Sequence, residues 1–462
     1  MPRFDLAVLG GGPGGYVAAI RGAQLGKKVC IIDKDKLGGV CLNWGCIPTK
    51  ALIKNAEVHN LVKHADKYGI IIEKFKVDYK SNVKRSRDIS TRLSKGIEFL
   101  IKKNNITHVN GFGRLVSSNS ISVKKGTKTQ IIEAENIIIA TGARPRSFPG
   151  MDFDGNRIIS SKEAMMLEAP PKDMIIIGSG AIGVEFAYYF NEFGTKVHVM
   201  EMMDRILPNE DADVSKEVET NFERSGIIIS KNMKVSKIEA MKTKVKVHVD
   251  GQRSKEIIES DKVLMAVGVV GNIEDIGLED IGIQLESGAI KTDQFNKTNV
   301  KNIYAIGDVC GPPWLAHVAS AQGHVAVEHA FGINAIPIDY SNIPGCTYCQ
   351  PQVGSLGMTE EQAIQSGYEI QVGKFSFQAS GKAMAVGNTE GFVKLIFDKQ
   401  YGELLGAHIV GSEATEMIAE LGIAKALETT WENIATTIHA HPTLSEAIME
   451  AAMDAYGQSI HQ

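Results

Sequence analysis

The chain has little cysteine, little net charge and no long apolar run. Its six cysteines among 462 residues are too few for a scaffold held together by disulfides. The formal net charge of −4 gives no indication of a nucleic-acid-binding or membrane-binding surface. No stretch of about 18 apolar residues is present, so we expect no transmembrane helix. Phe4–Leu9 already has the pattern of a strand, which leaves no room for a signal peptide and predicts a cytosolic protein.

The composition that remains is that of a globular protein. Hydrophobic residues make up 44% of the chain and charged residues 23%, which is enough apolar material for several cores. The length predicts about three domains. In a reducing cytosol, two cysteines close together in sequence are more often catalytic or metal-binding than structural.

A glycine-rich motif occurs twice, 168 residues apart. Each copy has a strand, a GxGxxG turn, a helical stretch, a second strand and then an acidic residue 23 positions after the first glycine. This is the βαβ fingerprint of dinucleotide binding. The first copy has Gly10, Gly12, Gly15 and Asp33, and the second has Gly178, Gly180, Gly183 and Glu201.

The chemistry of the fingerprint is local. The first glycine allows a tight turn, the second lets a pyrophosphate approach the backbone, and the third lets the helix pack on the strand. The helix N-terminus offers free N–H groups to the phosphates, and the acid accepts hydrogen bonds from ribose hydroxyls. One GxGxxG alone is weak evidence, and one of the two copies could be a vestigial βαβ unit. Two copies in the same context predict two dinucleotide sites.

Cys41 and Cys46 follow the first motif and enclose four residues. The segment after Cys46 predicts a helix with Pro48 in its first turn. The helix N-terminus, with Lys50, would lower the pKa of the Cys46 thiol and favour thiol–disulfide exchange. The alternatives are two inert buried cysteines or half of a zinc site. Because no second Cys/His pair lies nearby, zinc is disfavoured, and we expect no metal.

The other cysteines carry weaker signals. Cys346 and Cys349 form a CxxC far in sequence from both glycine turns. We expect two structural thiols there, and a second redox or metal site is the alternative. Cys30 and Cys310 receive no role.

Two further groups are candidates for proton transfer or ion pairing. Glu446 could orient the imidazole of His441 as a general acid/base, or it could form a capping box with Thr443 at the start of the last helix. His439 competes with His441 for that role. Glu185 follows the second glycine motif and could be surface or could pair with a buried lysine such as Lys50.

The chain divides into four segments. We expect the first part of one dinucleotide domain over 1–145, a second dinucleotide domain over 146–270, the remainder of the first domain over 271–342, and an α+β domain over 343–462. The predicted class is therefore α/β, with two Rossmann-like domains followed by a C-terminal α+β domain.

In combination and order, these motifs resemble the pyridine nucleotide–disulfide oxidoreductases, and within them the branch that oxidises dihydrolipoamide. The resemblance covers essentially the whole chain. It rests on both glycine turns, Gly38–Lys50, Ala305–Asp308 and His441–Glu446. It implies FAD at the first turn and NAD at the second, and a C-terminal domain that dimerises.

The resemblance also assigns residues to the cofactors. Asp33 would bind the adenosine ribose of FAD, where the family more often has Glu, and Lys50 would lie near the flavin, paired with Glu185. The other implied FAD contacts are Gly113, Thr141, Gly142, Ala143, Asp308, Leu315, Ala316 and His317. Val235 and Gly268 would contact NAD. The family commonly has Arg-x-Pro-Asn after that glycine, and Val269–Asn272 here lacks the arginine, which affects the expected NAD contacts rather than the fold.

The implied reaction is a relay of two electrons from dihydrolipoamide through a Cys41–Cys46 disulfide and FAD to NAD⁺. His441 and Glu446 would come from the opposite subunit of a homodimer, which favours His441 over His439. The implied partners are a lipoyl domain carrying dihydrolipoamide and the E2 acyltransferase core of a 2-oxoacid dehydrogenase complex.

Two other functions are weighed against this one. A sister reductase that runs from NADPH, such as a glutathione or mercuric reductase, is disfavoured because Glu201 would repel a 2′-phosphate. The last residues, 458–462, also lack the C-terminal cysteine pair that is expected of a mercuric reductase. A non-catalytic nucleotide-bound scaffold is disfavoured because both cysteines, Lys50, His441 and Glu446 are all retained.

Overall fold

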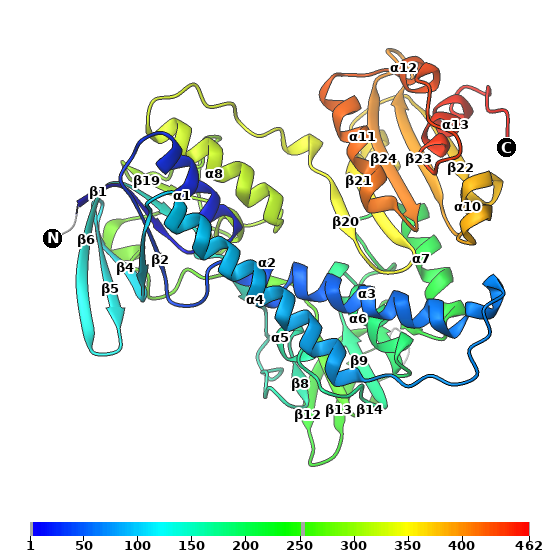
Figure 1. The fold of residues 1–462 in the computed structure, drawn as a ribbon, viewed down its shortest axis with the longest axis horizontal. Coiled ribbons are helices and arrows are strands. Elements are labelled where there is room, and N and C mark those ends of the chain that lie inside the picture. The colour runs from blue at the N-terminus through cyan, green and yellow to red at the C-terminus, as the bar shows by residue number, and fades with distance from the viewer. Residues whose placement is uncertain (1–2, 251–254, 462) are drawn as a thin grey trace.

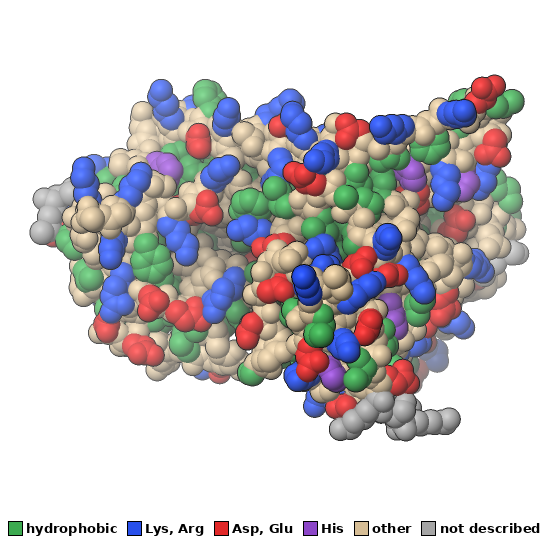
Figure 2. All heavy atoms as spheres, turned by 90° about the horizontal axis from the view of Figure 1, so that it is seen from below, with side chains coloured by type: hydrophobic (Ala, Val, Ile, Leu, Met, Phe, Trp, Pro, Cys, Tyr) green, Lys and Arg blue, Asp and Glu red, His purple; other side chains and the backbone are tan. Residues whose placement is uncertain are grey.

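The structure is a computed structural model that describes residues 3–250 and 255–461. It contains three principal sheets, each covered by helices (Figure 1). None of the helices in these two ranges is both long and apolar enough to cross a membrane. Figure 2 shows one face of the molecule with acidic and basic side chains interspersed, in keeping with the small net charge.

The first sheet surrounds the first glycine turn. Its strand order is β3-β2-β1-β6-β5-β4, and β19 also pairs with β6. Strands β1, β2, β3, β6 and β19 are parallel, so that β19, from much later in the chain, completes the same sheet. The strands are β1 (Arg3–Leu9), β2 (Val29–Asp33), β3 (Thr107–Asn110), β4 (Phe112–Ser117), β5 (Ser120–Lys125), β6 (Lys128–Ile139) and β19 (Ile303–Ala305). The principal helices around this sheet are α1 (Pro13–Gln24), α2 (Gly39–Trp44), α3 (Cys46–Lys63), α4 (Tyr79–Lys103) and α8 (Ala316–Ala330).

The second sheet repeats this plan around the second glycine turn. It is parallel with order β11-β10-β9-β15-β8. A three-stranded antiparallel sheet, β12-β13-β14, lies beside it. The elements are β8 (Ile158–Ile159), α5 (Ser161–Ala164), β9 (Asp173–Ile177), α6 (Ala181–Glu192), β10 (Lys196–Met200), α7 (Ala212–Arg224), β11 (Ile228–Ser230), β12 (Lys234–Ala240), β13 (Val245–Asp250), β14 (Lys255–Ser260) and β15 (Lys262–Met265). The crossing between the two units is a short ribbon of β7 (Ala143–Pro145) and β16 (Val269–Gly271).

The C-terminal domain has an antiparallel sheet of order β20-β21-β24-β23-β22. Its central strands β23 and β24 are buried along their whole length, because helices cover the sheet. The elements are β20 (Gly345–Thr347), β21 (Gln352–Gly357), α9 (Glu360–Gln365), β22 (Ile370–Ser376), α10 (Gly381–Val386), β23 (Phe392–Asp398), β24 (Leu404–Gly411), α11 (Ala414–Ala426), α12 (Trp431–Thr436) and α13 (Glu446–Asp454). The predicted class of two Rossmann-like units followed by an α+β domain is confirmed.

A buried ion-pair cluster joins the second unit to the C-terminal domain. Lys394, on β23, has a side chain that is 2% exposed, and its Nζ lies 2.8 Å from Asp211, 3.0 Å from Asp213 and 2.7 Å from Glu360. Asp211 is the N-cap of α7, and its other carboxylate oxygen accepts the N–H of Glu360 at the start of α9. The sequence pattern of this strand predicts burial but gives no sign of the cluster.

Candidate active site

The two cysteines of the first motif lie at the junction of two helices. Cys41 is in the middle of α2, and Cys46 is the first residue of α3, with Gly45 between the helices. Pro48 lies in the first turn of α3, as predicted. Both thiols are partly buried, and the Cys41 thiol donates a hydrogen bond to the Cys46 sulfur.

The environment separates the acidities of the two thiols. The hydrogen bond from Cys41 is the largest effect on Cys46, and with the charge of Lys50 and a backbone N–H it outweighs burial and lowers the pKa of Cys46 to about 7. The same hydrogen bond, followed by burial, raises the pKa of Cys41. Cys46 is therefore the thiolate of the pair and the better leaving group in exchange. Lys50 lowers the pKa of Cys46, as the sequence predicts, whereas the larger lowering by Cys41 has no signal in the sequence.

We expect the reduced protein to alkylate at Cys46 with a half-maximal rate near pH 7. The pKa is lowered, so the thiolate predominates above that pH and is lost as the pH falls through it. The measurement is the iodoacetamide rate against pH, with peptide mass spectrometry to identify the modified residue. Cys349 is fully buried and serves as the internal control that stays unmodified. A half-maximum near the ordinary value of about 8.5 would contradict this expectation.

Lys50 and Glu185 form the pair that the sequence left undecided. Lys50 Nζ lies 2.9 Å from each carboxylate oxygen of Glu185, whose side chain is 5% exposed. Tyr348, from the turn after β20, donates its backbone N–H to the same carboxylate at 3.0 Å and places its ring 4.5 Å from Lys50 Nζ. Sequence analysis missed Tyr348, because it lies in another domain and carries no local motif.

The glycines of both turns divide into two kinds. A Cβ on the first or third glycine would meet a backbone oxygen: at 2.1 Å for Gly10, 1.9 Å for Gly15, 2.4 Å for Gly178 and 2.0 Å for Gly183. These positions keep the turn and helix together. A Cβ on Gly180 would meet nothing within 4 Å, and one on Gly12 only Gly39 Cα at 3.9 Å. The middle glycines therefore leave the helix N-terminus open, as a bound pyrophosphate requires.

A cavity of about 410 Å³ lies beside the first turn. Its lining includes Gly10, Asp33, Gly113 and Thr141, the residues for which the family resemblance implies FAD contacts. The volume lies within the range of small-molecule sites. Asp33 already accepts the N–H of Gly11 at 2.5 Å, so its carboxylate faces the turn.

The carboxyl group of Asp308 is a second feature that bears on FAD binding. It follows β19 and is the second residue of a short 3₁₀ helix, Gly307–Cys310. Burial raises the pKa of its carboxyl group, and among the residues the structure describes its side chain has no hydrogen-bond partner. A partly buried carboxyl group without a protein partner fits a polar ligand such as the ribityl chain of FAD. The residues at the first turn therefore fit this cofactor.

The remaining FAD candidates lie in two segments. Thr141 and Gly142 are tied to Asn272 by hydrogen bonds of 2.8–2.9 Å, and Ala143 begins β7. Leu315 is the N-cap of α8, which starts with Ala316 and His317. His317 Nε2 lies 3.0 Å from the carbonyl oxygen of Pro344, at the entry to the C-terminal domain.

The second turn has the same features. Glu201 is buried and accepts the N–H of Ser179 at 2.9 Å and its hydroxyl at 2.6 Å. Val235 is partly buried on β12, and Gly268 has φ +94° with open space at its Cβ position. Val269–Gly271 form β16, so the segment that lacks the arginine is held by backbone pairing with β7.

His441 and Glu446 form a hydrogen-bonded pair. His441 Nδ1 lies 2.8 Å from Glu446 Oε1, while Glu446 Oε2 accepts the N–H of Thr443 at 2.8 Å. The N–H of Thr443 and then His441 lower the pKa of the Glu446 carboxyl group. The alternative capping box is not complete, because Thr443 Oγ1 donates to Ala440 and Ser445 is the N-cap of α13.

The competing histidine is occupied on both ring nitrogens. His439 Nδ1 lies 2.9 Å from the carbonyl oxygen of Thr437, and Nε2 lies 2.8 Å from Glu420. Its side chain is 5% exposed, whereas that of His441 is 80% exposed. No hydrogen bond or ion pair in the described ranges joins His441 to Cys41 or Cys46. The segment before α13 lies in the C-terminal domain, while α2 and α3 meet near the centre of the molecule (Figure 1).

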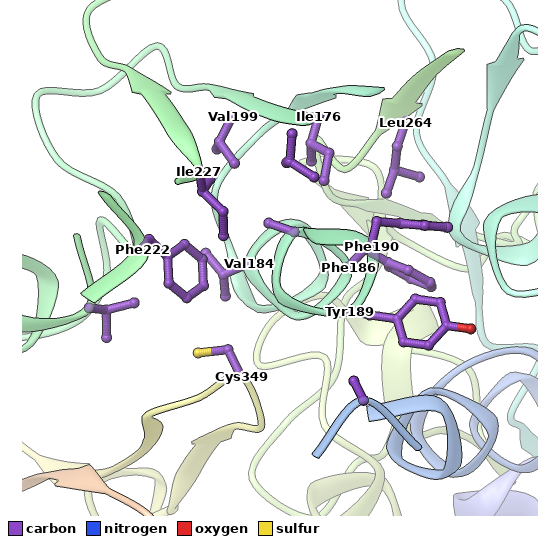
Figure 3. Close-up of a cluster of buried hydrophobic side chains, with 14 of the residues drawn as sticks. Ile176, Val184, Phe186, Tyr189, Phe190, Val199, Phe222, Ile227, Leu264 and Cys349 are labelled. Carbon is purple, nitrogen blue, oxygen red and sulfur yellow. The ribbon is translucent and has the colours of Figure 1, made fainter. Parts of the chain in front are cut away.

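The CxxC of the C-terminal domain lies near the Lys50 pair. Burial raises the pKa of both thiols, and Cys349 points into the apolar cluster around α6, beside Val184 and Phe222 (Figure 3). Its Sγ lies 3.3 Å from the carbonyl oxygen of Pro351. This environment is that of a structural thiol for Cys349.

Comparisons with known proteins give the same assignment over the whole length. The profile described as pyridine nucleotide-disulphide oxidoreductase matches residues 4–323, and the dimerisation domain of that family matches residues 343–452. A dihydrolipoyl dehydrogenase of Rhizobium etli is 46% identical, with 99% of each chain covered, and one of Bacillus subtilis is 41% identical, also with 99% of each covered.

Solved structures agree with the sequence relatives. The crystal structure of LpdA from Mycobacterium tuberculosis has a TM-score of 0.91 at 28% identity, with 98% of this chain and 99% of that chain covered. The HOCl-induced flavoprotein disulfide reductase RclA from Escherichia coli has a TM-score of 0.86 at 27% identity, with 97% of this chain and 99% of that chain covered. The chain belongs to the pyridine nucleotide-disulphide oxidoreductase family, which uses FAD and NAD.

Proposed function

We propose that this chain is a dihydrolipoyl dehydrogenase, which oxidises dihydrolipoamide on a lipoyl domain to lipoamide with NAD⁺ as the acceptor. The observation that carries the proposal is the placement of Cys41 and Cys46 at the α2–α3 junction, with Cys46 at the N-terminus of α3 and the Lys50–Glu185 ion pair in its first turn. Full-length relatives that carry this name support it. FAD at the first turn supplies the redox step between the dithiol and NAD⁺.

The protein's own residues perform the exchange in two steps. His441, with Nδ1 held by Glu446, accepts the proton of a dihydrolipoamide thiol at Nε2. The resulting thiolate attacks Cys41 Sγ, the Cys41–Cys46 bond breaks, and Cys46 leaves as the thiolate. The second lipoyl thiol then gives its proton to Cys41 as its sulfur displaces Cys41 Sγ from the mixed disulfide. Lipoamide is released, with Cys41 as a thiol, Cys46 as a thiolate and one proton on His441. Attack on Cys41 expels the more acidic sulfur, which is the favoured direction.

The proposed assembly is a homodimer. Glu446 begins α13, which lies in the C-terminal domain away from α2 (Figure 1), and residues 343–452 match the family's dimerisation domain. In the proposed dimer, His441 and Glu446 serve the cysteines of the partner subunit. The E2 acyltransferase core of a 2-oxoacid dehydrogenase complex is the proposed larger partner.

The test is absorbance at 340 nm with purified protein, dihydrolipoamide and either NAD⁺ or NADP⁺. We expect rapid formation of NADH and little NADPH. No product from dihydrolipoamide, together with NADPH-driven reduction of another disulfide, would transfer the assignment to a sister reductase.

Replacing Glu201 by glutamine should reduce kcat/KM for NAD⁺ by about 10- to 100-fold, because it removes a hydrogen bond between a charged carboxylate and the ribose. The discrimination against NADP⁺ should fall at the same time, because the carboxylate that repels a 2′-phosphate is removed. Steady-state kinetics with both nucleotides measure the two effects. If the ratio of kcat/KM for NAD⁺ to kcat/KM for NADP⁺ did not change, Glu201 would not be a nucleotide-binding residue.

A further inference from the structure

A row of buried polar side chains on α4 contacts the segment that carries Cys41 and Cys46. Ser86, Ser90 and Ser94 are 0%, 1% and 3% exposed, and their spacing of four residues places them on one face of the helix. Figure 1 shows α4 crossing α3 and passing by α2. The cysteine chemistry described above assigns no role to this row.

Two serines of the row and the neighbouring Arg87 donate hydrogen bonds to backbone carbonyl groups before, between and after the cysteines. Ser94 Oγ donates to the carbonyl of Leu37 at 2.7 Å, before Cys41, and Ser86 Oγ donates to that of Pro48 at 3.0 Å, after Cys46. Between the cysteines, Arg87 Nη2 donates to the carbonyl of Asn43 at 2.5 Å. The same nitrogen lies 2.5 Å from Ser90 Oγ, so Ser90 orients the guanidinium.

A second set of contacts holds the side chain of Trp44, one of the four residues between the cysteines. The Trp44 ring lies 4.7 Å from Arg87 Cζ and 4.6 Å from Lys162 Nζ, which comes from α5. One residue of α4 therefore holds both the backbone at Asn43 and the ring of Trp44. Each cation attracts the face of the ring, so the ring is held from two sides.

Ordinary packing does not account for these donors. A serine inside a helix commonly bonds the carbonyl four residues earlier in its own helix, whereas Ser86 and Ser94 bond another segment. The α2 C-terminus also has carbonyl groups without partners in the helix, and Arg87 satisfies that of Asn43. Apolar residues would cover α2 and α3 without fixing these carbonyl positions.

We propose that Arg87, with Ser86 and Ser94, positions the Cys41–Cys46 pair for reversible disulfide formation; this inference rests on the proposed function. These donors hold the backbone before, between and after the cysteines at one spacing in both redox states. Closing the S–S bond then orders little further chain, which raises the effective concentration of one thiol at the other. The row acts through the backbone and does not touch substrate.

The test measures the dithiol–disulfide equilibrium of the holoenzyme in dithiothreitol redox buffers. On oxidation, the two thiols lose two electrons and two protons as the S–S bond forms, and oxidised dithiothreitol is reduced by them. Acid quenching, alkylation and mass spectrometry then give the fraction of disulfide. We expect Arg87→Gln to shift the equilibrium about tenfold toward the dithiol, or about 30 mV for two electrons.

Arg87→Lys keeps one donor and the charge, and should recover part of the shift. The double variant Ser86→Ala/Ser94→Ala should also shift the equilibrium toward the dithiol. Because alanine favours the helix, this variant should fold. It therefore tests the positioning role even if Arg87→Gln does not fold. Arg92→Gln, at an exposed position of the same helix, is the matched control and should behave as wild type.

The outcomes separate this inference from the proposed function. If the wild type forms no Cys41–Cys46 disulfide in any buffer, the proposed function fails. If the wild type forms it but Arg87→Gln or the double serine variant matches Arg92→Gln, the positioning role is overturned. A graded shift in Arg87→Gln and Arg87→Lys, with none in Arg92→Gln, supports it.

Discussion

Replacing Cys41 by serine is expected to reduce dihydrolipoamide oxidation by at least about 1000-fold, because the sulfur that the substrate thiolate attacks is removed. Serine cannot form a disulfide with Cys46, so the exchange has no starting bond. A 340 nm assay with dihydrolipoamide and NAD⁺ measures the loss. The variant should remain folded and yellow, since Cys41 lies in a six-residue helix whose backbone contacts do not use its side chain.

The matched control is Cys346→Ser, a second partly buried thiol outside the proposed exchange. It should retain most of the wild-type rate. If Cys41→Ser kept a rate within about tenfold of wild type, the disulfide mechanism would be excluded, whatever the redox state of Cys46.

Replacing Lys394 by alanine is expected to lower the free energy of unfolding by about 3–5 kcal/mol, because it leaves the buried carboxylate of Asp211 without its cation. Asp211 is 1% exposed and cannot turn to water in place. Urea or thermal unfolding, followed by circular dichroism, measures the change. Lys399→Ala, at an exposed pair with Glu369, is the control and should cost about 0–1 kcal/mol.

The same cluster predicts acid sensitivity. Burial would raise the pKa of Asp211, but the hydrogen bond from Lys394 and the neighbouring contacts lower it overall, and Asp213 behaves in the same way. A lowered pKa contributes stability above the unfolded value of about 4, and this is lost as the pH falls through the folded value. Wild type should therefore lose stability more steeply below about pH 4 than Lys394→Ala does. If the free energy of unfolding fell with pH at the same rate in wild type and in Lys394→Ala, protonation of the cluster would not contribute to acid sensitivity.

Much of the fold was predictable because its signals are local. The two glycine turns form where the sequence predicts them, and the strand expected over Phe4–Leu9 is observed as β1, Arg3–Leu9. Each depends on a short pattern: glycines where a Cβ would meet backbone, and apolar runs that parallel strands bury on both faces. The repeat made the assignment stronger than one copy allowed.

The site was predictable only in part. Cys41, Cys46 and Lys50 lie within ten residues, so their proximity follows from one short stretch of chain, the end of α2 and the first turn of α3. Glu185 lies 135 positions from Lys50, and its pairing became visible only in the structure. Tyr348, Arg87 and the Lys394 cluster gave no sequence signal, since each contact joins segments with no pattern in common.

By itself, the sequence determined the two dinucleotide turns, the position of Cys46 at a helix N-terminus and the His441–Glu446 spacing, because these depend on residues a few positions apart. Only the tertiary structure decided that Lys50 pairs with Glu185, that His439 is occupied while His441 is exposed, and that α4 holds the cysteine segment. The physical reason is that hydrogen bonds and ion pairs depend on distances of about 3 Å in space, which chain separation does not encode.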